Sequence, residues 1–523
     1  MSDAPANPAQ ISRRHWAILG VILAAAALLR FYQIGGPSLW KDEIWSVEMA
    51  MGRGSIHDQL PPNVIRTDQP DLTGLAGAAP WWSICTHLGG VTHPPLYFVV
   101  LRGWIDLFGT GAAATRSLSA IFSLAAIFVF FDVCRFLHGP RIAPLAAVLM
   151  ALAVAQIDFA QDARGYTLLI LLGLCAVDFL LRIELQGVTA ARLAGLAICF
   201  AAAALTHYLA AGALPALAAY AAIRLPSRAR RQTLAALAAG AILTLAAWIP
   251  LFITQTHTLP SLAPTFLQEY RVADHAKLTL FRIVGLPIEF LLGESGGESL
   301  ARRAPNLVLA VFLLTVALPI LRLGHRRDLL LWSLWTIGII GFVAVLDLAH
   351  QTTLVGYPRY TILASPAIYA VIAAFDWPRR KVLRDVLAIA FIAATAVAVL
   401  SRVDTGVAPL EDWRKLAHDL DANAAPDDLF VFTNPDPWVS PGTWYMGLKY
   451  CAPASHHPWL ILTTPADPAI LRQLQSSRRL WLIGPHREIQ GPDLLPGWRR
   501  QLLISTTAGD ACRMIPIDSR SSP

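Results

Sequence analysis

Long apolar runs separated by short polar turns fill most of residues 1–402. A bilayer core takes about 20 mostly apolar helical residues, so each run of roughly that length predicts a membrane-spanning helix. The chain is therefore predicted to be a polytopic α-helical membrane protein with about 11 transmembrane helices. The predicted spans cover residues 16–34, 116–135, 141–160, 165–182, 192–207, 208–224, 232–253, 305–322, 328–349, 360–377 and 385–402.

Two further apolar stretches, residues 94–108 and 277–292, are too short to cross a membrane and are interrupted by charged residues or proline. An apolar face combined with internal charges is typical of a helix that lies in the membrane interface. We therefore predict interfacial helices for both stretches, the first of them within the first outer loop.

Arginine and lysine clusters test this topology, because cytoplasmic ends of spans collect positive charge. The predicted order puts one set of clusters on a single side of the membrane, together with the N-terminus. The opposite, outer side then receives residues 35–115, residues 254–304 and the tail from about residue 403. The clusters on the cytoplasmic side are Arg13/Arg14, Arg135/Arg141, Arg182/Arg192, Arg224–Arg231, Arg322–Arg327 and Arg379–Arg384.

The tail changes character and predicts a small extracytoplasmic α/β domain. Strand-like apolar segments alternate with helical ones, which is typical of an α/β fold. The chain thus divides into a membrane domain, residues 1–402, and a tail domain, residues 403–523. Cys451 and Cys512 both lie in the tail, where an oxidising compartment would permit a disulfide between them. The predicted helices cover residues 412–420 and 468–474, and the strands residues 429–432, 459–462 and 480–483.

Composition agrees with a membrane protein and argues against a nucleic-acid partner. Hydrophobic residues make up 55% of the chain and charged residues only 15%, unlike a typical water-soluble domain. The net charge of +7 comes mainly from the short arginine clusters, which carry the topology signal rather than a nucleic-acid footprint. The six cysteines form no CxxC pair, so no structural zinc site is predicted.

The strongest local signal is the acidic pair Asp42 and Glu43, in the segment Leu39-Trp40-Lys41-Asp42-Glu43 directly after the first span. One interpretation is a helix N-terminus, where acidic side chains complement the helix dipole. The other is a general base with a neighbour that orients a substrate or a metal ion. The residues alone leave both open.

Polar residues also gather at the outer ends of other spans. Each has a structural explanation taken singly: Asp162 and Arg164 can form an ion pair, and a lone histidine such as His207 is often structural. Their shared position favours one active site at the lipid boundary instead, because placing charges at this depth is costly unless they pair or bind something. The further residues at these ends are His93, Arg116, Tyr166, Tyr208, Arg359 and Tyr360.

Two other classes of function compete with an enzyme. A polytopic transporter would place ionisable groups near the membrane midplane in broken helices, often in repeated halves, whereas here they lie at span ends. A non-catalytic protein of envelope assembly would use the tail as its binding module.

Four motifs resemble those of GT-C glycosyltransferases: the Asp42-Glu43 pair after the first helix, His93-Pro94-Pro95 opening a juxtamembrane helix, Asp162-Ala163-Arg164-Gly165-Tyr166, and Arg359-Tyr360 followed by Pro366. Within that fold the chain is most similar to the protein O-mannosyltransferase and lipid A aminoarabinose transferase group of bacteria, often called glycosyltransferase family 39-like. The resemblance covers roughly residues 16–377.

This resemblance implies a polyprenyl-phosphate-linked sugar donor, a glycolipid or protein hydroxyl as acceptor, and inversion at the anomeric carbon. Asp42 would be the catalytic base with Glu43 beside it, and Asp162 a second acidic loop residue. Arg116, Arg164 and Arg359 would bind the donor phosphate, since guanidinium groups bind phosphate oxygens in pairs.

The remaining candidates, His93, Tyr166, His207, Tyr208 and Tyr360, would line the substrate site. The family uses a divalent cation in some members only, so Mg²⁺, Mn²⁺, Zn²⁺ and no metal all stay open. The expected location is the bacterial inner membrane, with the N-terminus in the cytoplasm and the active site outside.

Overall fold

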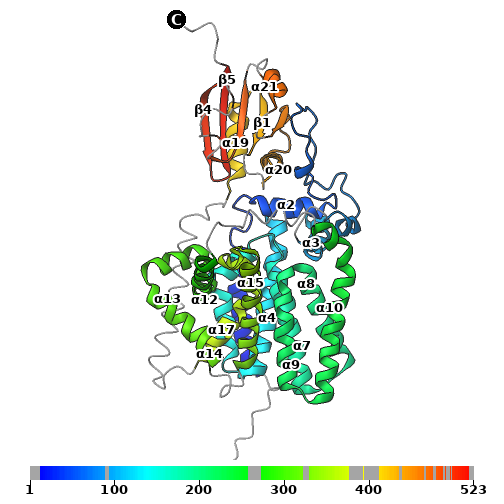
Figure 1. Ribbon diagram of the computed structural model, residues 1–523, viewed down its shortest axis with the longest axis vertical. Coiled ribbons are helices and arrows are strands. Elements are labelled where there is room, and N and C mark those ends of the chain that lie inside the picture. The colour runs from blue at the N-terminus through cyan, green and yellow to red at the C-terminus, as the bar shows by residue number, and fades with distance from the viewer. Residues whose placement is uncertain are drawn as a thin grey trace, which may run out of the picture. The chain divides into compact units, whose positions relative to one another are not determined.

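The computed structural model describes residues 12–88, 93–256, 272–321, 329–375, 393, 411–434, 439–463, 467–474, 479–486, 489, 495 and 498–516. Its internal contacts divide the chain into two compact units (Figure 1). The first unit comprises residues 1–34, 92–97 and 116–406, and the second comprises residues 35–91, 98–115 and 407–523. The first outer loop therefore belongs with the tail. The division expected from sequence, near residue 403, falls outside the described residues.

The first unit is helical in all of its described elements. Its closest packing joins α7 to α8, α8 to α10, and α15 to α9, and these helices lie side by side in Figure 1. The elements are α1 (Arg13–Phe31), α4 (Ala112–His138), α5 (Ala143–Leu152), α6 (Val154–Ala160), α7 (Tyr166–Gln186), α8 (Ala190–Thr206), η3 (Tyr208–Gly212), α9 (Ala213–Arg224), α10 (Ser227–Thr256), α12 (Val272–Arg303), α13 (Pro305–Phe312), the π-turn η4 (Leu313–Ala317), α14 (Leu318–Leu321), α15 (Leu330–His350), η6 (Leu354–Gly356), α16 (Pro358–Thr361), η7 (Ile362–Ala364) and α17 (Ser365–Ala374).

Several of these helices are long and apolar enough to cross a membrane. Among the described residues α1, α4, α10 and α15 qualify singly, and the bent pairs α5/α6 and α12 to α14 qualify if each is one span. Leu28 and Val21 of α1 are 76% and 70% exposed, as expected where lipid replaces water. The chain is thus a multi-pass membrane protein, while the count of eleven spans stays a prediction, and the span over residues 385–402 lies outside the described part.

Two predicted helices have other bounds in the structure: one is divided into two helices, and the other is part of a longer helix that is interrupted at a glycine. Residues 141–160 form two helices that meet at a bend of 61°, between Leu152 and Val154. The predicted helix over residues 277–292 is part of the longer α12, whose backbone leaves helical geometry at Gly293, with φ 76°. Glycine adopts this left-handed conformation without the steric cost that a Cβ imposes.

Arg30 stabilises the first of these breaks. It is fully buried and donates hydrogen bonds to the carbonyl oxygens of Ala151 (3.0 Å) and Met150 (3.4 Å) and to Ser123 Oγ (2.8 Å). The last carbonyls of a helix lack partners within it, and Arg30 supplies them at the end of α5. It thereby helps to set the direction of α6 and of the loop that follows.

The second unit contains a mixed five-stranded sheet in the order β2-β1-β3-β5-β4. Strand β1 is parallel to β2 and β3, whereas β5 is antiparallel to β3 and β4. The predicted strands and helices of the tail are all present. The elements are α2 (Lys41–Ala50), η1 (His57–Gln59), η2 (Trp81–Thr86), α3 (Leu96–Phe108), α19 (Trp413–Asn423), β1 (Leu429–Thr433), α20 (Gly442–Cys451), β2 (Trp459–Leu462), α21 (Pro468–Leu474), β3 (Leu480–Gly484), β4 (Trp498–Thr506) and β5 (Gly509–Pro516).

Alternation along the strands gives the sheet two buried faces. Val431 of β1 aligns with Leu460 of β2 and Leu482 of β3 and joins a core cluster with Ile470 and Leu474 of α21. Since successive strand residues point to opposite faces, Phe430 and Phe432 lie on the other face. Phe432 contacts Tyr445 of α20 there, at 5.8 Å between ring centroids.

The first outer loop pairs with the edge strand of this sheet. The Asn63 and Arg66 amides donate to the carbonyls of Ile461 and Trp459, both at 2.8 Å, and the Trp459 amide returns a bond to Arg66. Exposed sheet edges invite pairing with other chains, and the loop satisfies this one. The loop and the tail therefore fold together although more than 300 residues of chain separate them.

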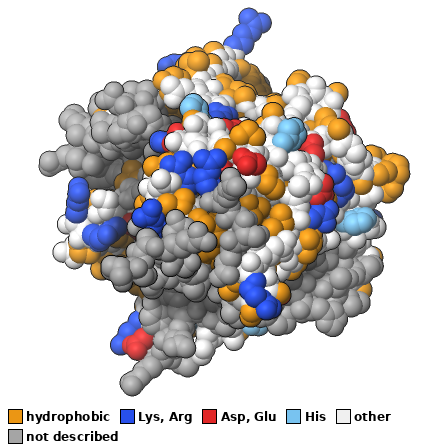
Figure 2. All heavy atoms as spheres, turned by 90° about the horizontal axis from the view of Figure 1, so that it is seen from above, with side chains coloured by type: hydrophobic (Ala, Val, Ile, Leu, Met, Phe, Trp, Pro, Cys, Tyr) orange, Lys and Arg blue, Asp and Glu red, His pale blue; other side chains and the backbone are white. Residues whose placement is uncertain are grey.

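Three elements of the second unit were not predicted from sequence. Helix α20 and strands β4 and β5 extend the predicted α/β core. Cys451 and Cys512 are both free thiols, so the disulfide is absent. Figure 2 shows one face of the molecule, on which basic, acidic and hydrophobic side chains are interspersed.

Candidate active site

The loop between α6 and α7, residues 161–165, is held rigidly at both ends. The Gln161 side-chain amide donates to the carbonyls of Leu29, Arg30 and Tyr32, at 3.2, 3.2 and 2.9 Å. A Cβ on Gly165 would lie 3.1 Å from the Thr206 methyl and 3.2 Å from the Tyr97 Cβ. Only glycine fits comfortably at this close approach. The loop therefore has little freedom to reorient.

Arg164 projects from this loop into a buried position. It is 4% exposed, and its guanidinium Nη2 lies 2.9 Å from His93 Nε2. Burial and the positive charge of Arg164 lower the pKa of His93 well below its ordinary value, with His207 and Arg359 acting in the same direction. His93 is therefore neutral at pH 7 and accepts a hydrogen bond from Arg164.

His207 lies at the end of α8, next to His93. Its Nδ1 accepts the Leu209 amide at 3.2 Å. Its Nε2 is buried and has no hydrogen-bond partner among the residues that the structure describes. A buried polar atom without a partner is costly and calls for an explanation; a ligand that occupies the site would supply one.

Aromatic rings surround His207. The centroid of its ring lies 5.9 Å from that of His93, 6.2 Å from Tyr166 and 6.3 Å from Tyr360. Asp162 lies close enough to the Tyr166 hydroxyl to act on it electrostatically, as do both Arg164 and Arg359. Sequence reasoning chose all of these residues, and the structure brings them together.

Arg359 is the second cation of the cluster. It lies in the short helix α16, and its guanidinium carbon is 5.2 Å from the Tyr357 ring centroid and 5.3 Å from that of Tyr360. Stacking on aromatic faces holds arginine in a fixed orientation. Two guanidinium groups beside a neutral histidine make this site suited to an anion.

Two candidates have other contacts in the structure. Arg116 is buried near the start of α4 and donates to the Ile34 carbonyl at 3.1 Å, so it anchors the chain where α1 has ended. Tyr208 packs against Trp248 of α10, with 5.3 Å between ring centroids and the rings tilted by 56°. The ring contacts of His207 instead involve His93, Tyr166 and Tyr360.

Helix α12 contributes charged residues that sequence reasoning missed. Glu294 follows the break at Gly293 and interacts electrostatically with Arg359. Arg282 forms an ion pair with Glu298 at 3.6 Å and packs at 3.5 Å from where a Cβ of Gly356 would lie. The signal in the sequence is Gly293-Glu294-Ser295-Gly296-Gly297-Glu298, a polar and glycine-rich interruption of an apolar helix, which membrane proteins use around binding sites.

Asp42 and Glu43 belong to the second unit, in the first turn of α2. The Glu43 side chain is fully buried and accepts the Trp40 amide at 3.1 Å, which is half of a capping box. Asp42 is partly exposed. The two adjacent carboxylates therefore have different surroundings, and Glu43 has a structural task.

Glu411, from the tail, holds the same helix end. Its carboxylate accepts the Lys41 amide at 2.6 Å and the Trp413 indole N–H at 2.9 Å, and it pairs with Lys41 Nζ at 3.5 Å. Burial raises the pKa of Glu411; Lys41 opposes this shift and the nearby Asp42 carboxylate adds to it. Two carboxylates therefore accept backbone amides at the start of helix α2: Glu43 from Trp40 and Glu411 from Lys41.

Metal ligation is the remaining question about the site. Within the described residues, no group of three or more His, Cys, Asp and Glu side chains is arranged to hold a metal ion.

Comparisons with known proteins match this architecture. Residues 92–253 match the family described as dolichyl-phosphate-mannose-protein mannosyltransferase. The fold is similar to the crystal structure of ArnT from Cupriavidus metallidurans in the apo state, with 14% identity, a TM-score of 0.56, and coverage of 98% of this chain and 99% of that one. The same ArnT bound to undecaprenyl phosphate gives 15% identity, a TM-score of 0.57, and coverage of 98% and 100%.

Comparison with curated protein sequences gives no match. The family match spans the motifs of His93, Arg164 and His207, and the shared fold extends over nearly the whole chain. The chain therefore shares the fold of ArnT over nearly its whole length, and its residues 92–253 match the family described as dolichyl-phosphate-mannose-protein mannosyltransferase.

Proposed function

We propose that the chain transfers a sugar from a polyprenyl-phosphate donor to a hydroxyl group of an envelope glycolipid or protein, on the outer face of the membrane. The observation that carries this proposal is the buried cluster of the first unit, in which Arg164 and Arg359 lie beside neutral His93 and the unpaired Nε2 of His207. An anionic ligand suits the two guanidinium groups, and its oxygen atoms would give His207 Nε2 the hydrogen-bond partner that it lacks among the described residues.

A lipid-linked phosphate fits that requirement. Guanidinium groups bind phosphate oxygens through two parallel hydrogen bonds, and the His207 nitrogen provides one further polar contact. The structure of ArnT that resembles this chain was solved with undecaprenyl phosphate bound, which supports a donor of the same class here.

The chemistry needs few catalytic groups, because the polyprenyl phosphate released from the phosphodiester donor is already a competent leaving group. Asp42 takes the proton of the acceptor hydroxyl as the oxygen attacks the anomeric carbon. The bond from that carbon to the phosphate oxygen breaks, and its electron pair leaves with the polyprenyl phosphate. Arg164 and Arg359 stabilise the charge on the departing phosphate. A single displacement of this kind inverts the anomeric configuration.

The other acidic residues have supporting roles in this proposal. Glu43 fixes the start of α2 and so orients Asp42, in keeping with its buried capping contact. Asp162 positions the substrate beside Arg164. Tyr166 and Tyr360 line the same cluster and help to exclude water, which would otherwise compete with the acceptor hydroxyl.

The proposed location follows from the arginine clusters of the sequence. They place the N-terminus in the cytoplasm and the Asp162–Arg164 loop on the opposite side. A bacterial inner membrane would supply both the polyprenyl donor and the envelope acceptor on that side.

The test is Arg164→Lys in purified protein reconstituted in lipid nanodiscs. Lysine keeps the charge but cannot form the two-pronged contact. We expect the affinity for undecaprenyl phosphate to fall at least tenfold, about 1.4 kcal/mol, with transfer reduced in parallel. Arg302→Lys is the matched control, since that side chain is 78% exposed. Normal affinity in Arg164→Lys would remove the phosphate from this cluster and end the proposal in its present form.

A further inference from the structure

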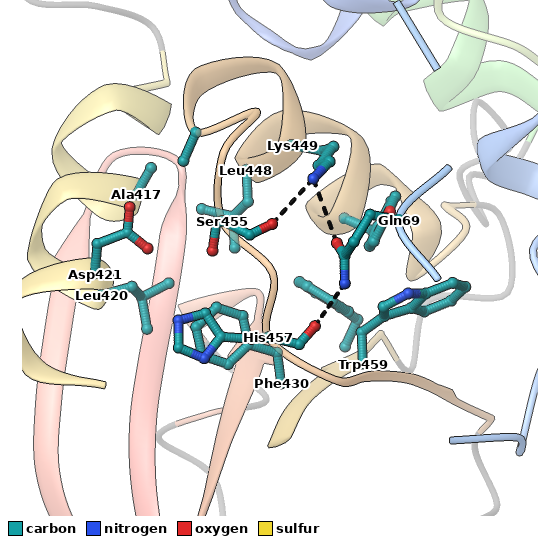
Figure 3. Close-up of a pocket in the computed structure, with 13 residues that line it drawn as sticks. Gln69, Ala417, Leu420, Asp421, Phe430, Leu448, Lys449, Ser455, His457 and Trp459 are labelled. Atoms are coloured by element: carbon teal, nitrogen blue, oxygen red, sulfur yellow. Dashed lines mark hydrogen bonds between the residues drawn. The ribbon is translucent and has the colours of Figure 1, made fainter. Parts of the chain in front are cut away.

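A hollow in the second unit shares no lining residue with the candidate active site (Figure 3). It opens between α19, β1, α20 and the segment that leads into β2. Counted out to its mouth, the empty volume is about 380 Å³. The enclosed part holds no more than a few water-sized spheres, so the hollow suits the edge of a ring rather than a whole buried ligand.

The floor of the hollow is aromatic and rigid. The His457 ring stacks on Phe430 with 4.2 Å between centroids and 16° between planes. Tyr445 packs between Phe432 at 5.8 Å and Trp459 at 4.7 Å, and its hydroxyl donates to the Pro70 carbonyl at 3.3 Å. Rings locked in this way form a preorganised surface for a ligand.

Three polar groups at the hollow have unused hydrogen-bonding capacity. His457 Nδ1 is buried without a partner among the described residues. Within that same part of the chain, the exposed Asp421 carboxylate and the Ser455 hydroxyl also make no side-chain hydrogen bond. Figure 3 shows Asp421, Ser455 and His457 around the same hollow. A carboxylate, a hydroxyl and an imidazole together offer both donors and acceptors.

Lys449, which lines the hollow, already makes hydrogen bonds within the protein. Lys449 Nζ donates to the carbonyls of Pro453 (2.8 Å) and Ser455 (3.0 Å) and lies 3.4 Å from Gln69 Oε1, while the Gln69 amide donates to the His457 carbonyl at 2.8 Å. These bonds tie the rim together. They leave no spare cation for a phosphate, and the Asp421 carboxylate would repel one.

We propose that this hollow binds the edge of a neutral saccharide ring. Sugar hydroxyls donate and accept at once, which matches Asp421, Ser455 and His457 Nδ1. The C–H face of the sugar suits the negative face of an aromatic ring. A purely apolar ligand would leave the His457 nitrogen buried and unpaired, at a cost that a hydroxyl removes.

The saccharide has two possible sources with the same chemistry: the glycan part of the acceptor in the proposed transfer, or a separate envelope glycan. In either case the tail recognises sugar independently of Asp42. Binding can therefore be measured in the Asp42→Asn variant, in which transfer is strongly reduced. Loss of transfer alone tests the proposed function, and loss of sugar binding alone tests the hollow.

The experiment titrates mannose, glucose, galactose and arabinose into the full-length protein in nanodiscs, observed by saturation-transfer difference NMR. We expect saturable binding of at least one sugar. Asp421→Asn and His457→Phe, which keeps the stack but removes the nitrogen, should each weaken it about tenfold, the size of one lost hydrogen bond to a charged or buried group. The control Asp427→Asn changes an exposed acid outside the hollow and should leave the affinity unchanged.

Two further readouts complete the test. A raised KM for a glycolipid acceptor in Asp421→Asn, with the KM for a simple alcohol unchanged, assigns the saccharide to the acceptor. An unchanged KM with weakened free-sugar binding assigns it to a separate glycan. The proposal is overturned by an absence of saturable sugar binding, by equal affinities in all variants, or by competition from inorganic phosphate.

Discussion

Asp42 and Glu43 are neighbours in sequence whose side chains have different tasks. Glu43 is fully buried and accepts the Trp40 amide, whereas Asp42 is partly exposed. We expect Asp42→Asn to lower turnover at least about a hundredfold, the usual scale for a positioned acid-base group, with donor binding retained. Glu43→Gln should instead cost about 1 kcal/mol of stability through the weakened cap. Turnover, donor affinity and thermal unfolding of both purified variants check this.

The opposite pattern would reverse the assignment. Full transfer by Asp42→Asn would exclude it as the base. Loss of donor binding in the same variant would make Asp42 a donor ligand instead.

His93 makes stability depend on pH. Its pKa is lowered well below the ordinary value in the folded protein, so the unfolded chain takes up this proton first as pH falls. The resulting stability is present above about pH 6.5, the unfolded pKa, and is lost as pH falls through the lowered folded value. We expect the melting temperature of the wild type to drop more steeply between pH 7 and pH 5 than that of His93→Gln.

The control for His93 is His418→Gln, because the His418 side chain is 78% exposed. It should keep the wild-type slope of melting temperature against pH. Parallel slopes in wild type and His93→Gln would show that His93 does not carry this effect.

The residues of the site were only partly predictable from sequence. Arg164, His207 and Arg359 were predicted together because each ends or begins a span on the same side. Tyr208 was predicted by the same rule, but its ring packs on Trp248. The direction of this side chain depends on how the helices pack, which the sequence pattern does not show. Glu294 was missed because residues 277–292 were predicted as a self-contained helix, and the break at Gly293 falls just beyond it.

At the scale of elements, the start of helix α2 depends on the tail. Glu411 accepts the Lys41 amide and pairs with its ammonium group. We expect Glu411→Ala to lower turnover several-fold, because Asp42 loses its fixed position, while undecaprenyl phosphate affinity stays unchanged. Glu411→Gln keeps an acceptor for the amide and should recover part of the loss.

Asp427→Ala, an exposed acid of the same domain, is the control for that experiment. If Glu411→Ala and Asp427→Ala turned over alike, the contact would be structural only and the tail would not position the base.

Elements were predictable where hydrophobic periodicity is clean. Strands β1, β2 and β3 are buried at every position, and their short apolar runs predicted them. Strand β4 alternates irregularly, with Arg499, Arg500 and Gln501 exposed, so its pattern does not indicate a strand. Helix α20 begins directly after Pro441 and contains Gly447, which packs against the Trp413 ring. Glycine is unfavourable inside a helix, and the contact that requires it here cannot be read from the sequence.

At the scale of the whole molecule, the pairing of the first outer loop with the tail could not be read from the chain, since the partners, Asn63 with Ile461 and Arg66 with Trp459, are remote in sequence. Because the two segments fold as one unit, they must lie on the same side of the membrane. That requirement agrees with the topology predicted from the arginine clusters.

Cysteine labelling checks the orientation. Ala454 and Arg228 are both exposed, the first in the tail and the second in the first turn of α10. In a background without Cys85 and Cys451, a membrane-impermeant maleimide applied to intact spheroplasts should label Ala454→Cys and not Arg228→Cys. The reverse labelling would mean that the tail lies in the cytoplasm, and it would contradict transfer on the outer face.

The most direct test of glycosyl transfer from a lipid-linked donor is mass spectrometry of envelope lipids and proteins from a strain that carries only the Asp42→Asn variant, beside its parent. The account predicts that one polyprenyl-phosphate sugar accumulates and that one glycolipid or protein loses the corresponding sugar. Unchanged donor and acceptor pools, with the variant present in the membrane at the wild-type level, would contradict it.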